Sequence, residues 1–257
     1  MRQELISIIT PSYNSSDYVS ETIEAILRQT YQNWELIITD DCSTDNTCEI
    51  IEKYAAEDSR IKLFRQSKNL GAGAARNNSI KEAKGRYIAF CDSDDRWYPD
   101  KLEKQVAFMQ KMDCALSYTS YITCTEEGEN HGLVICRRKE TFATTKRDDK
   151  IGCLTAMYDT EKVGKVYMPL IRKRQDWGLM LNILMQCDVA YGIKEPLAIY
   201  RLRNNSISSN KKSLVKYNIR LYQDVLGWSK IRASLFFCFV FMPSYIAKKV
   251  FVSMYNR

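Results

Sequence analysis

Residues 87–99 read YIAFCDSDDRWYP, an apolar run that passes directly into a group of carboxylates. The run 87–91 contains no charged side chain, which is typical of a strand buried on both faces of a parallel sheet. Asp92, Asp94 and Asp95 follow it at once. Because ligands of open parallel sheets bind beyond the carboxyl ends of the strands, this stretch predicts both an α/β fold and the edge where its site lies.

Outward from this stretch, apolar runs alternate with amphipathic segments, as expected for β-α units around a parallel sheet. The predicted strands of the first hundred residues are 5–10 (LISIIT), 34–39 (WELIIT), 61–64 and 87–91. The predicted helices are 17–29, one beginning near Ser43 or Asp45, 74–83, and one from Pro99 to Met112. The fold class is therefore α/β, with a mostly parallel central sheet flanked by helices.

The second half of the chain has a less regular pattern. We expect strands near 115–123 and 133–137, a mobile charged excursion over 139–150, a helix over 177–186, strands near 189–193 and 197–202, and a long helix around 212–225. The apolar segment 233–247 follows and reaches about 22 Å as a helix, against a hydrocarbon core of about 30 Å. We therefore expect a helix lying in a membrane interface, with packing against the domain as the alternative.

The composition is that of a globular protein with a basic end. The 257 residues are 27% charged and 45% hydrophobic, which fits one domain plus a tail. The net charge of +7 is unevenly distributed: residues 1–100 carry 12 basic and 17 acidic side chains, whereas 201–257 carry 11 basic side chains and one acidic residue, Asp224. Such a tail suits anionic lipid, nucleic acid or phosphorylated substrates, or is simply a solvated helix.

Cysteine and histidine usage excludes several kinds of chemistry. Nine cysteines occur singly, with no CxxC pair, and His131 is the only histidine. Zinc clusters and Ser-His-Asp or Cys-His nucleophiles are therefore not expected. The start of the chain shows no secretory signal, and together these features favour a reducing cytoplasm. Any general base should be a carboxylate.

Aspartates end two of the predicted strands. Asp40 and Asp41 follow 34–39, as the aspartates of 92–95 follow 87–91. Up to five carboxylates at one edge would repel one another and recruit Mg²⁺ or Mn²⁺, ions that usually also hold substrate phosphates. The sequence therefore predicts a metal-bridged nucleotide, with turn and helix-cap chemistry as the alternative for Asp40 and Asp41.

The glycine-rich loop GAGAAR (71–76) is not a dinucleotide fingerprint, because Arg76 stands where the third glycine is needed. No GxxxxGK[ST] sequence occurs either. NAD and P-loop nucleotide sites are therefore not expected.

Four blocks, taken in order, resemble the family 2 glycosyltransferases of the GT-A fold. They are SIITPSYN (7–14), ITDDCSTD (38–45), NLGAGAARN (69–77), and FCDSDD (90–95) with Trp97, Pro99, Asp100 and Leu102. The resemblance implies a Rossmann-like GT-A domain over 1–210, with a nucleotide-sugar-binding half (1–102) and an acceptor-binding and catalytic half (103–210). A basic, helical, membrane-proximal segment (211–257) would follow.

The resemblance also implies roles for single residues in the first half. Pro11 and Tyr13 would line the nucleotide pocket, and Asp41 would contact the base, usually uracil. Arg76 would approach the nucleotide or its phosphates.

Asp92 and Asp94 would form the family's DxD element. Asp94 is expected to be the metal ligand, for Mn²⁺ or Mg²⁺, and Asp92 to lie nearer the ribose or water, with Asp95 helping to orient them. The metal would stabilise the departing nucleotide diphosphate.

In the second half, RQDW (174–177) resembles the block that carries the family's catalytic carboxylate. Asp176 is therefore the expected general base, and the alternative is a helix N-cap. Arg201 and Arg203 resemble part of the family's closing loop and would meet the diphosphate.

The function implied is an inverting, metal-dependent hexosyl- or N-acetylhexosaminyltransferase. It would move a sugar from a nucleotide sugar, usually a UDP-sugar, to a hydroxyl of a saccharide acceptor. We expect a polyprenyl-diphosphate-linked acceptor in capsule, O-antigen or lipopolysaccharide synthesis, a peripheral location at the cytoplasmic face of the inner membrane, and no nucleic-acid partner. The alternatives are a noncatalytic nucleotide-sugar binder and a DxD phosphatase of the haloacid-dehalogenase type.

Overall fold

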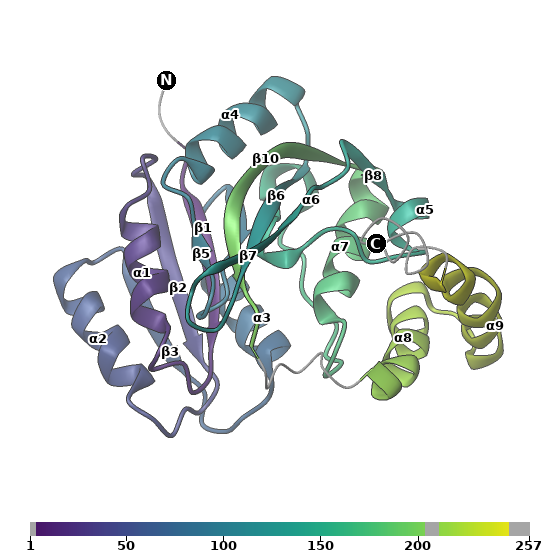
Figure 1. The fold of residues 1–257 in the computed structure, drawn as a ribbon, viewed down its shortest axis with the longest axis horizontal. Helices are drawn as coiled ribbons and strands as arrows, with labels where there is room; N and C mark the ends of the chain where they lie inside the picture. Colours follow the sequence, from purple (N-terminus) through teal and green to yellow (C-terminus); the bar gives the residue numbers. More distant parts are fainter. Residues whose placement is uncertain (1–3, 204–210, 247–257) are drawn as a thin grey trace.

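Four parallel strands form the first part of the sheet, in the order β3-β2-β1-β4. They are β1 (Ile6–Ser12), β2 (Trp34–Asp40), β3 (Ile61–Arg65) and β4 (Tyr87–Phe90). Every residue of β1, β2 and β4 is buried, as expected for strands covered on both faces. The structure, a computed structural model, describes residues 4–203 and 211–246 (Figure 1). It confirms the α/β fold with a mostly parallel central sheet flanked by helices.

Helices cover both faces of this sheet. On one face lie α1 (Val19–Leu27), α2 (Thr47–Glu57) and α4 (Lys101–Met112), and on the other lie α3 (Ala72–Glu82) and α7 (Gln175–Cys187). The alternation of side chains along β1 explains the two layers, because Ile6 and Ile8 join the first apolar cluster and Ile9 joins the second.

The second part of the sheet is mixed. β9 (Met157–Asp159) pairs antiparallel with β4 and with β6 (Leu116–Cys124), and β6 pairs parallel with β10 (Val189–Arg201). Two short strands pair with β10, namely β5 (Arg96–Trp97) and β8 (Lys139–Thr141). A third, β7 (Asn130–Val134), pairs with β6. A short helix, α6 (Thr160–Val163), and a 3₁₀ turn (Cys153–Thr155) flank β9.

Several predicted boundaries are wrong, and α2 begins at Thr47 rather than near Ser43 or Asp45. β10 is one strand where two were expected, because Pro196 lies at a register shift in which its missing N–H is tolerated. β7 begins at Asn130 rather than at residue 133. α4 begins at Lys101, since the carbonyl of Pro99 accepts a hydrogen bond from Thr30 N at 2.8 Å.

The stretch 139–150 contains regular structure, which corrects the prediction of a mobile excursion. β8 pairs with β10, and α5 (Phe142–Thr145) begins at a capping box formed by Thr141 and Thr144. The indole of Trp177 donates a hydrogen bond to the carbonyl of Thr145 at 2.7 Å. This contact attaches the short helix to α7, and sequence periodicity carries no signal for it.

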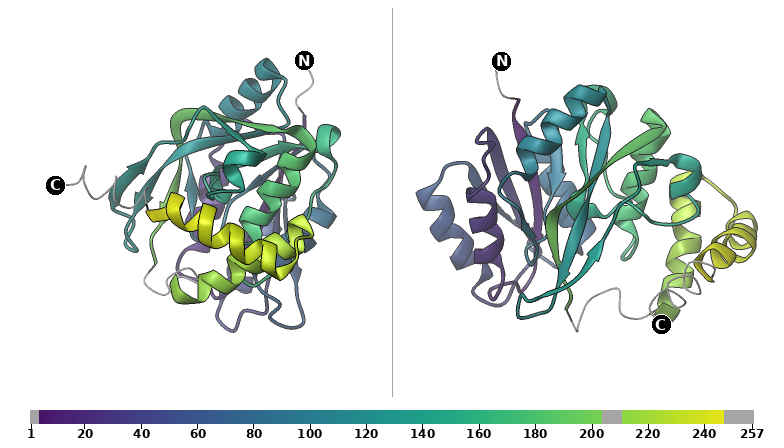
Figure 2. Two further views of the ribbon diagram at one scale, coloured as in Figure 1. Left: turned by 90° about the vertical axis from the view of Figure 1, so that its right-hand side faces the viewer. Right: turned by 45° about the horizontal axis from the view of Figure 1, so that its top comes forward.

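The C-terminal helices α8 (Lys211–Leu226) and α9 (Lys230–Phe236) lie at the end of the molecule opposite β3 (Figure 2), and a π-helical turn (Phe237–Phe241) continues α9. One face of this segment joins α7 in a third apolar cluster, formed by Ile171, Trp177, Leu181, Leu221, Tyr222, Ala233, Phe237 and Phe241. Packing against the domain, the alternative for 233–247, is therefore confirmed for one face; residues 247–257 lie outside the described residues. Within 4–203 and 211–246, none of the helices combines the length and the apolar character needed to cross a bilayer.

Lys101, at the start of α4, is a fully buried lysine. Its Nζ donates a hydrogen bond to Gln105 Oε1 at 2.6 Å and lies 4.1 Å from the centre of the Trp97 ring. Burial lowers the pKa of Lys101 from 10.5 to about 7, because the low-dielectric core disfavours the ammonium form. Between these two pH values the unfolded chain therefore holds a proton that the folded chain has released.

This difference predicts a pH dependence of stability that belongs to Lys101. We expect the free energy of unfolding of the wild type, relative to Lys101→Met, to rise by up to about 1.4 kcal/mol per pH unit between pH 7 and 10. Urea denaturation across that range measures it. Lys111→Met, an exposed position on the same helix, is the control. Parallel pH curves for wild type and Lys101→Met would contradict the prediction.

Candidate functional site

The carboxyl ends of β1, β2 and β4 lie at one edge of the sheet, on the lower side in Figure 1. β1 stays paired with β2 as far as Ser12, whereas its pairing with β4 stops at Ile9. Pro11 lies beyond that last pair, so its missing N–H leaves no bond to β4 unmade. Pro11 is buried, but Tyr13, two residues on, is 48% exposed at this edge.

Asp40 and Asp41 are buried and hold loops in place. The Oγ of Ser12 donates a hydrogen bond to Asp40 at 2.9 Å. The two oxygens of Asp41 accept hydrogen bonds from the backbone N–H groups of Leu70 and Gly71, both at 2.7 Å. Asp41 thereby fastens the glycine-rich loop to the end of β2. Gly71 has a φ of +91°, a conformation that favours glycine.

Asp92 forms an ion pair with Arg76 of α3. Nη2 of Arg76 lies 2.6 and 2.7 Å from the two carboxylate oxygens, and only 7% of the arginine is exposed. Burial opposes the charge of Arg76, but the Asp92 carboxylate raises the pKa of Arg76 above its usual range. The pair keeps a buried cation at the predicted site.

Asp94 and Asp95 lie in a shared negative field. Burial raises the pKa of Asp94, and Asp92 raises it further, while Arg203, whose Nη1 is 3.3 Å from Asp94 Oδ2, opposes the shift. Burial, with Asp94 and Asp92, raises the pKa of Asp95 well above its usual range. One Asp95 oxygen accepts a hydrogen bond from Arg201 N at 2.8 Å, and the other has no partner among the described residues.

Arg201 and Arg203 differ in their surroundings. Arg201 is 4% exposed, and its guanidinium donates hydrogen bonds to the carbonyls of Asp94 (3.1 Å) and Glu126 (2.6 Å) and to the carboxylate of Glu21 (2.6 Å). These contacts suit a residue that positions Asp94 better than one that meets a diphosphate, the role predicted from the sequence. Arg203 is partly exposed and remains the candidate for that contact.

A serine pair joins two segments of this edge, and the sequence analysis did not identify it. The Oγ atoms of Ser15 and Ser93 lie 2.8 Å apart, although the residues are 78 positions apart in the chain. The only feature of the sequence that pointed to this pair was the place of Ser93 in the middle of the DxD element.

Asp176 lies in the first turn of α7, half-buried, where its carboxylate interacts electrostatically with Arg76. The helix dipole favours a negative charge at this end. Among the described residues no hydrogen bond engages the Asp176 carboxylate, which leaves both oxygens free to accept a proton. The structure thus brings Asp176 and Arg76 together from different halves of the chain.

Two side-chain amides hold this arrangement. Asn77, beside Arg76, bonds both the N–H (2.8 Å) and the carbonyl (2.9 Å) of Met168. With its amide oriented to satisfy its neighbours, Gln175 accepts from Gly73 N at 3.2 Å and donates to the carbonyl of Ile171 at 3.0 Å. α3 and the start of α7 are therefore locked together. Both amides stood inside or beside the motifs read from the sequence, but nothing there indicated their partners.

Arg174 is a further residue that the sequence analysis did not single out. Its φ of +71° is left-handed, an uncommon conformation for a residue with a side chain. Its Nε donates to Asn218 Oδ1 of α8 at 3.0 Å, and its Nη1 lies 3.6 Å from Asp149. Arg174 therefore links α8 to the turn that presents Asp176.

The five aspartates expected to gather around a metal do not form one cluster. Asp40 and Asp41 bond hydroxyl and backbone groups, and Asp92 pairs with Arg76. In the part of the chain that the structure describes, no group of three or more His, Cys, Asp and Glu side chains could hold a metal ion. Arginine side chains pair with Asp92 and Asp94, and hydroxyl or backbone groups bond Asp40 and Asp41, partners that strand order alone does not reveal.

Comparisons with known proteins show which family the chain resembles. The family model described as glycosyl transferase family 2 matches residues 7–161. The putative teichuronic acid biosynthesis glycosyltransferase TuaG of Bacillus subtilis is 43% identical, over 95% of this chain and 97% of its own length. The UDP-Glc:alpha-D-GlcNAc-diphosphoundecaprenol beta-1,3-glucosyltransferase WfgD of Escherichia coli is 38% identical, over 88% of this chain and 87% of its own.

A solved structure shares the fold. TarS of S. aureus in complex with UDP-GlcNAc superposes with a TM-score of 0.72 at 20% identity, over 92% of this chain and 73% of that chain. This likeness confirms the GT-A architecture. The match over 7–161 and the relative TuaG show that the chain belongs to glycosyl transferase family 2.

Proposed function

We propose that this glycosyltransferase moves a sugar from a UDP-sugar to a hydroxyl of a polyprenyl-diphosphate-linked saccharide, with inversion, during synthesis of a bacterial surface polysaccharide. Support comes from the name of WfgD, which describes a UDP-sugar donor and a diphosphoundecaprenol acceptor, and from that of TuaG, which places it in teichuronic acid biosynthesis. Whether the sugar is a hexose or an N-acetylhexosamine depends on the shape of the pocket.

The observation that carries the proposal is the half-buried Asp176 carboxylate in the first turn of α7, beside the Arg76–Asp92 ion pair. Asp176 takes the proton from the acceptor hydroxyl while that oxygen attacks the anomeric carbon opposite the diphosphate. Arg76 and Asp176 interact electrostatically across the two halves of the chain. One displacement of this kind inverts the anomeric centre.

The donor would bind along the edge formed by β1, β2 and β4. Tyr13 presents an exposed ring for the base, and Pro11 and Asp41 support the loops beside it. Arg203, which lies next to Asp94, would meet the diphosphate. Arg201 would act by holding the main chain of Asp94.

Asp94 fits the role of ligand to Mg²⁺ or Mn²⁺. Such ions are commonly held by one or two carboxylates together with substrate phosphates, so a cage of three carboxylates is not required. Burial and the neighbouring Asp92 raise the pKa of Asp94, because both disfavour its charged form. A bound cation would offset both effects by attracting the carboxylate. When bound, the ion supplies Lewis-acid stabilisation of the leaving diphosphate.

The C-terminal segment would hold the enzyme at the cytoplasmic face of the inner membrane as a peripheral protein. Ile231, Leu235 and Phe239 recur at intervals of four along α9 and its continuation, with exposed fractions of 75%, 54% and 74%. Lys230 and Arg232 flank this exposed stripe. An apolar stripe beside basic residues attracts an anionic bilayer through two forces at once.

Asp176→Asn tests the general base. The amide keeps the size of the side chain but accepts no proton, so transfer from UDP-sugars should slow by about 10²–10⁴-fold. Calorimetry should show UDP binding unchanged within about twofold. Asp188→Asn, at the other end of α7, is the matched control. Full activity in Asp176→Asn would remove the assignment of the base, and absence of transfer in the wild type with every UDP-sugar would favour a noncatalytic binder.

Asp94→Asn tests the metal ligand. Replacing one carboxylate oxygen by an amide nitrogen should weaken Mn²⁺ binding in the presence of UDP by at least about tenfold. Calorimetric titration of Mn²⁺ measures it, with Asp17→Asn on the exposed turn before α1 as the control. An unchanged dissociation constant would place the metal elsewhere.

The double variant Leu235→Ser/Phe239→Ser tests the exposed stripe. Removing two large apolar side chains should lower partition onto vesicles containing phosphatidylglycerol by about tenfold or more. Vesicle co-sedimentation measures the bound fraction. Leu133→Ser/Ile135→Ser changes two exposed apolar residues far along the chain from α9 and should bind vesicles as the wild type does. Equal losses in both variants would show that the stripe has no special part in binding.

A further inference from the structure

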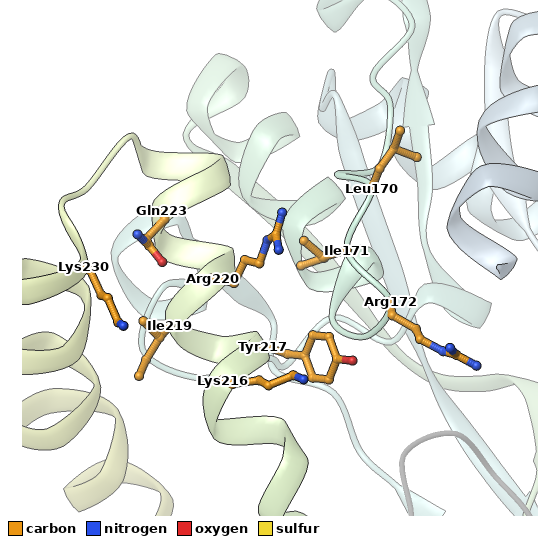
Figure 3. A pocket seen from close by; sticks show the side chains of 9 residues that line it. All are labelled: Leu170, Ile171, Arg172, Lys216, Tyr217, Ile219, Arg220, Gln223 and Lys230. Carbon is orange, nitrogen blue, oxygen red and sulfur yellow. The ribbon is translucent and has the colours of Figure 1, made fainter. Parts of the chain in front are cut away.

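A groove lies outside the donor edge, between the loop that precedes α7, the helix α8 and the start of α9 (Figure 3). We call it the α8 groove, and its volume is about 550 Å³. It is lined by Leu170, Ile171 and Arg172 of the loop, by Lys216, Tyr217, Ile219, Arg220 and Gln223 of α8, and by Lys230 of α9.

The lining is strongly cationic. Four of its nine residues are lysine or arginine, and none is acidic. Arg220 pairs with Asp224 on the exposed side of α8 at 3.1 Å. Among the described residues, Lys230 has no ion-pair partner. Figure 3 shows Arg220 between α8 and Ile171, and Lys230 extending from α9 toward Ile219. This arrangement suits a ligand with more than one negative charge.

The same groove also has an apolar side. Leu170 is 77% exposed, an unusual exposure for a leucine, and Ile171, Ile219 and Tyr217 lie along the groove with it. α9 begins at Lys230 and continues into the exposed apolar stripe of Ile231, Leu235 and Phe239. A ligand that matches this surface is therefore an amphiphile with a multivalent anion at one end.

The groove is coupled mechanically to the proposed base. Gln175, which precedes Asp176, holds the carbonyl of Ile171 in the groove wall. On α8, Asn218 lies between the lining residues Tyr217 and Ile219, and its side chain accepts the hydrogen bond from Arg174, two residues before Asp176. Both walls are therefore fixed to the turn that presents the base.

We propose that the α8 groove binds the diphosphate and the first isoprene units of a lipid-linked acceptor, so that the sugar attached to the diphosphate extends toward Asp176. This inference rests on the proposed function and identifies the part of the acceptor that the C-terminal segment recognises. The cations hold the diphosphate, Leu170 and Ile219 contact the hydrocarbon, and the remaining lipid follows α9 toward the bilayer. The donor diphosphate binds elsewhere, at the sheet edge beside Arg203.

The test is a binding titration of the full chain with farnesyl diphosphate, in the presence of saturating UDP to occupy the donor edge. Farnesyl diphosphate should bind, and Arg220→Gln/Lys230→Gln should weaken its binding by at least about tenfold, since two charge-assisted contacts are lost. The charge-conserving Arg220→Lys/Lys230→Arg should stay within about threefold of the wild type. Lys53→Gln/Lys111→Gln, with the same change in net charge on exposed helices, should leave binding unchanged.

Three further probes show whether the diphosphate, the hydrocarbon or a general affinity for lipid accounts for the binding of farnesyl diphosphate. Farnesol lacks the diphosphate and inorganic pyrophosphate lacks the lipid, and each should bind at least about tenfold more weakly than farnesyl diphosphate. Pyrophosphate binding as tight as farnesyl diphosphate would overturn the proposal in favour of a simple anion site. Vesicles of phosphatidylglycerol that displace farnesyl diphosphate completely would overturn it in favour of a general lipid-docking surface. Equal binding by the wild type and Arg220→Gln/Lys230→Gln would also overturn it.

Because this titration involves no turnover, its failure is distinct from failure of the proposed function. If the protein transfers sugar but does not bind farnesyl diphosphate, the proposed function stands and the proposal for the α8 groove is contradicted. If the protein binds farnesyl diphosphate through Arg220 and Lys230 but transfers no sugar from any UDP-sugar, the proposal for the groove stands and the proposed function is contradicted.

Discussion

The ion pair between the buried Arg76 and the partly exposed Asp92 is the interaction on which the site depends. It ties α3 to the end of β4, and it places a permanent positive charge in a region where several aspartates would otherwise repel one another. Such a pair adds little net stability, because the desolvation of Arg76 offsets its attraction to Asp92. The ion pair instead fixes the geometry of the site. It holds a cation from the first half of the chain in a constant position near Asp176.

The placement of Asp176 relies on side-chain amides rather than on secondary structure alone. Asn77 and Gln175 bond backbone groups on both sides of the junction between α3 and α7, and such bonds are costly to break where water is excluded. Arg174, in a left-handed conformation, extends the same network to α8. The C-terminal helices are therefore part of the architecture around the site. Their aromatic side chains pack on Trp177, while a basic groove and an apolar stripe remain exposed.

Long, regular elements were predictable because burial imposes a period on their sequence. The strands at 6–12 and 34–40 and the helix at 175–187 appear near their expected bounds for this reason. Short elements were not predictable: α5 has four residues, and a hydrogen bond from Trp177, 32 positions away, holds its end. Likewise the continuity of β10 through Pro196 depends on a bulge against β6, which no local pattern announces.

For the site, the sequence by itself determined which residues end the strands and which family motifs they form, because strand order and motif spacing are properties of the chain. It could not show how their charges are balanced. Only the tertiary structure decided that Asp41 bonds the backbone of the glycine-rich loop and that Arg76 neutralises Asp92. It also decided that Arg201 bonds the main chain of Asp94. The physical reason is that a carboxylate's role depends on the donors within about 3 Å of it, and those donors come from segments far apart in sequence.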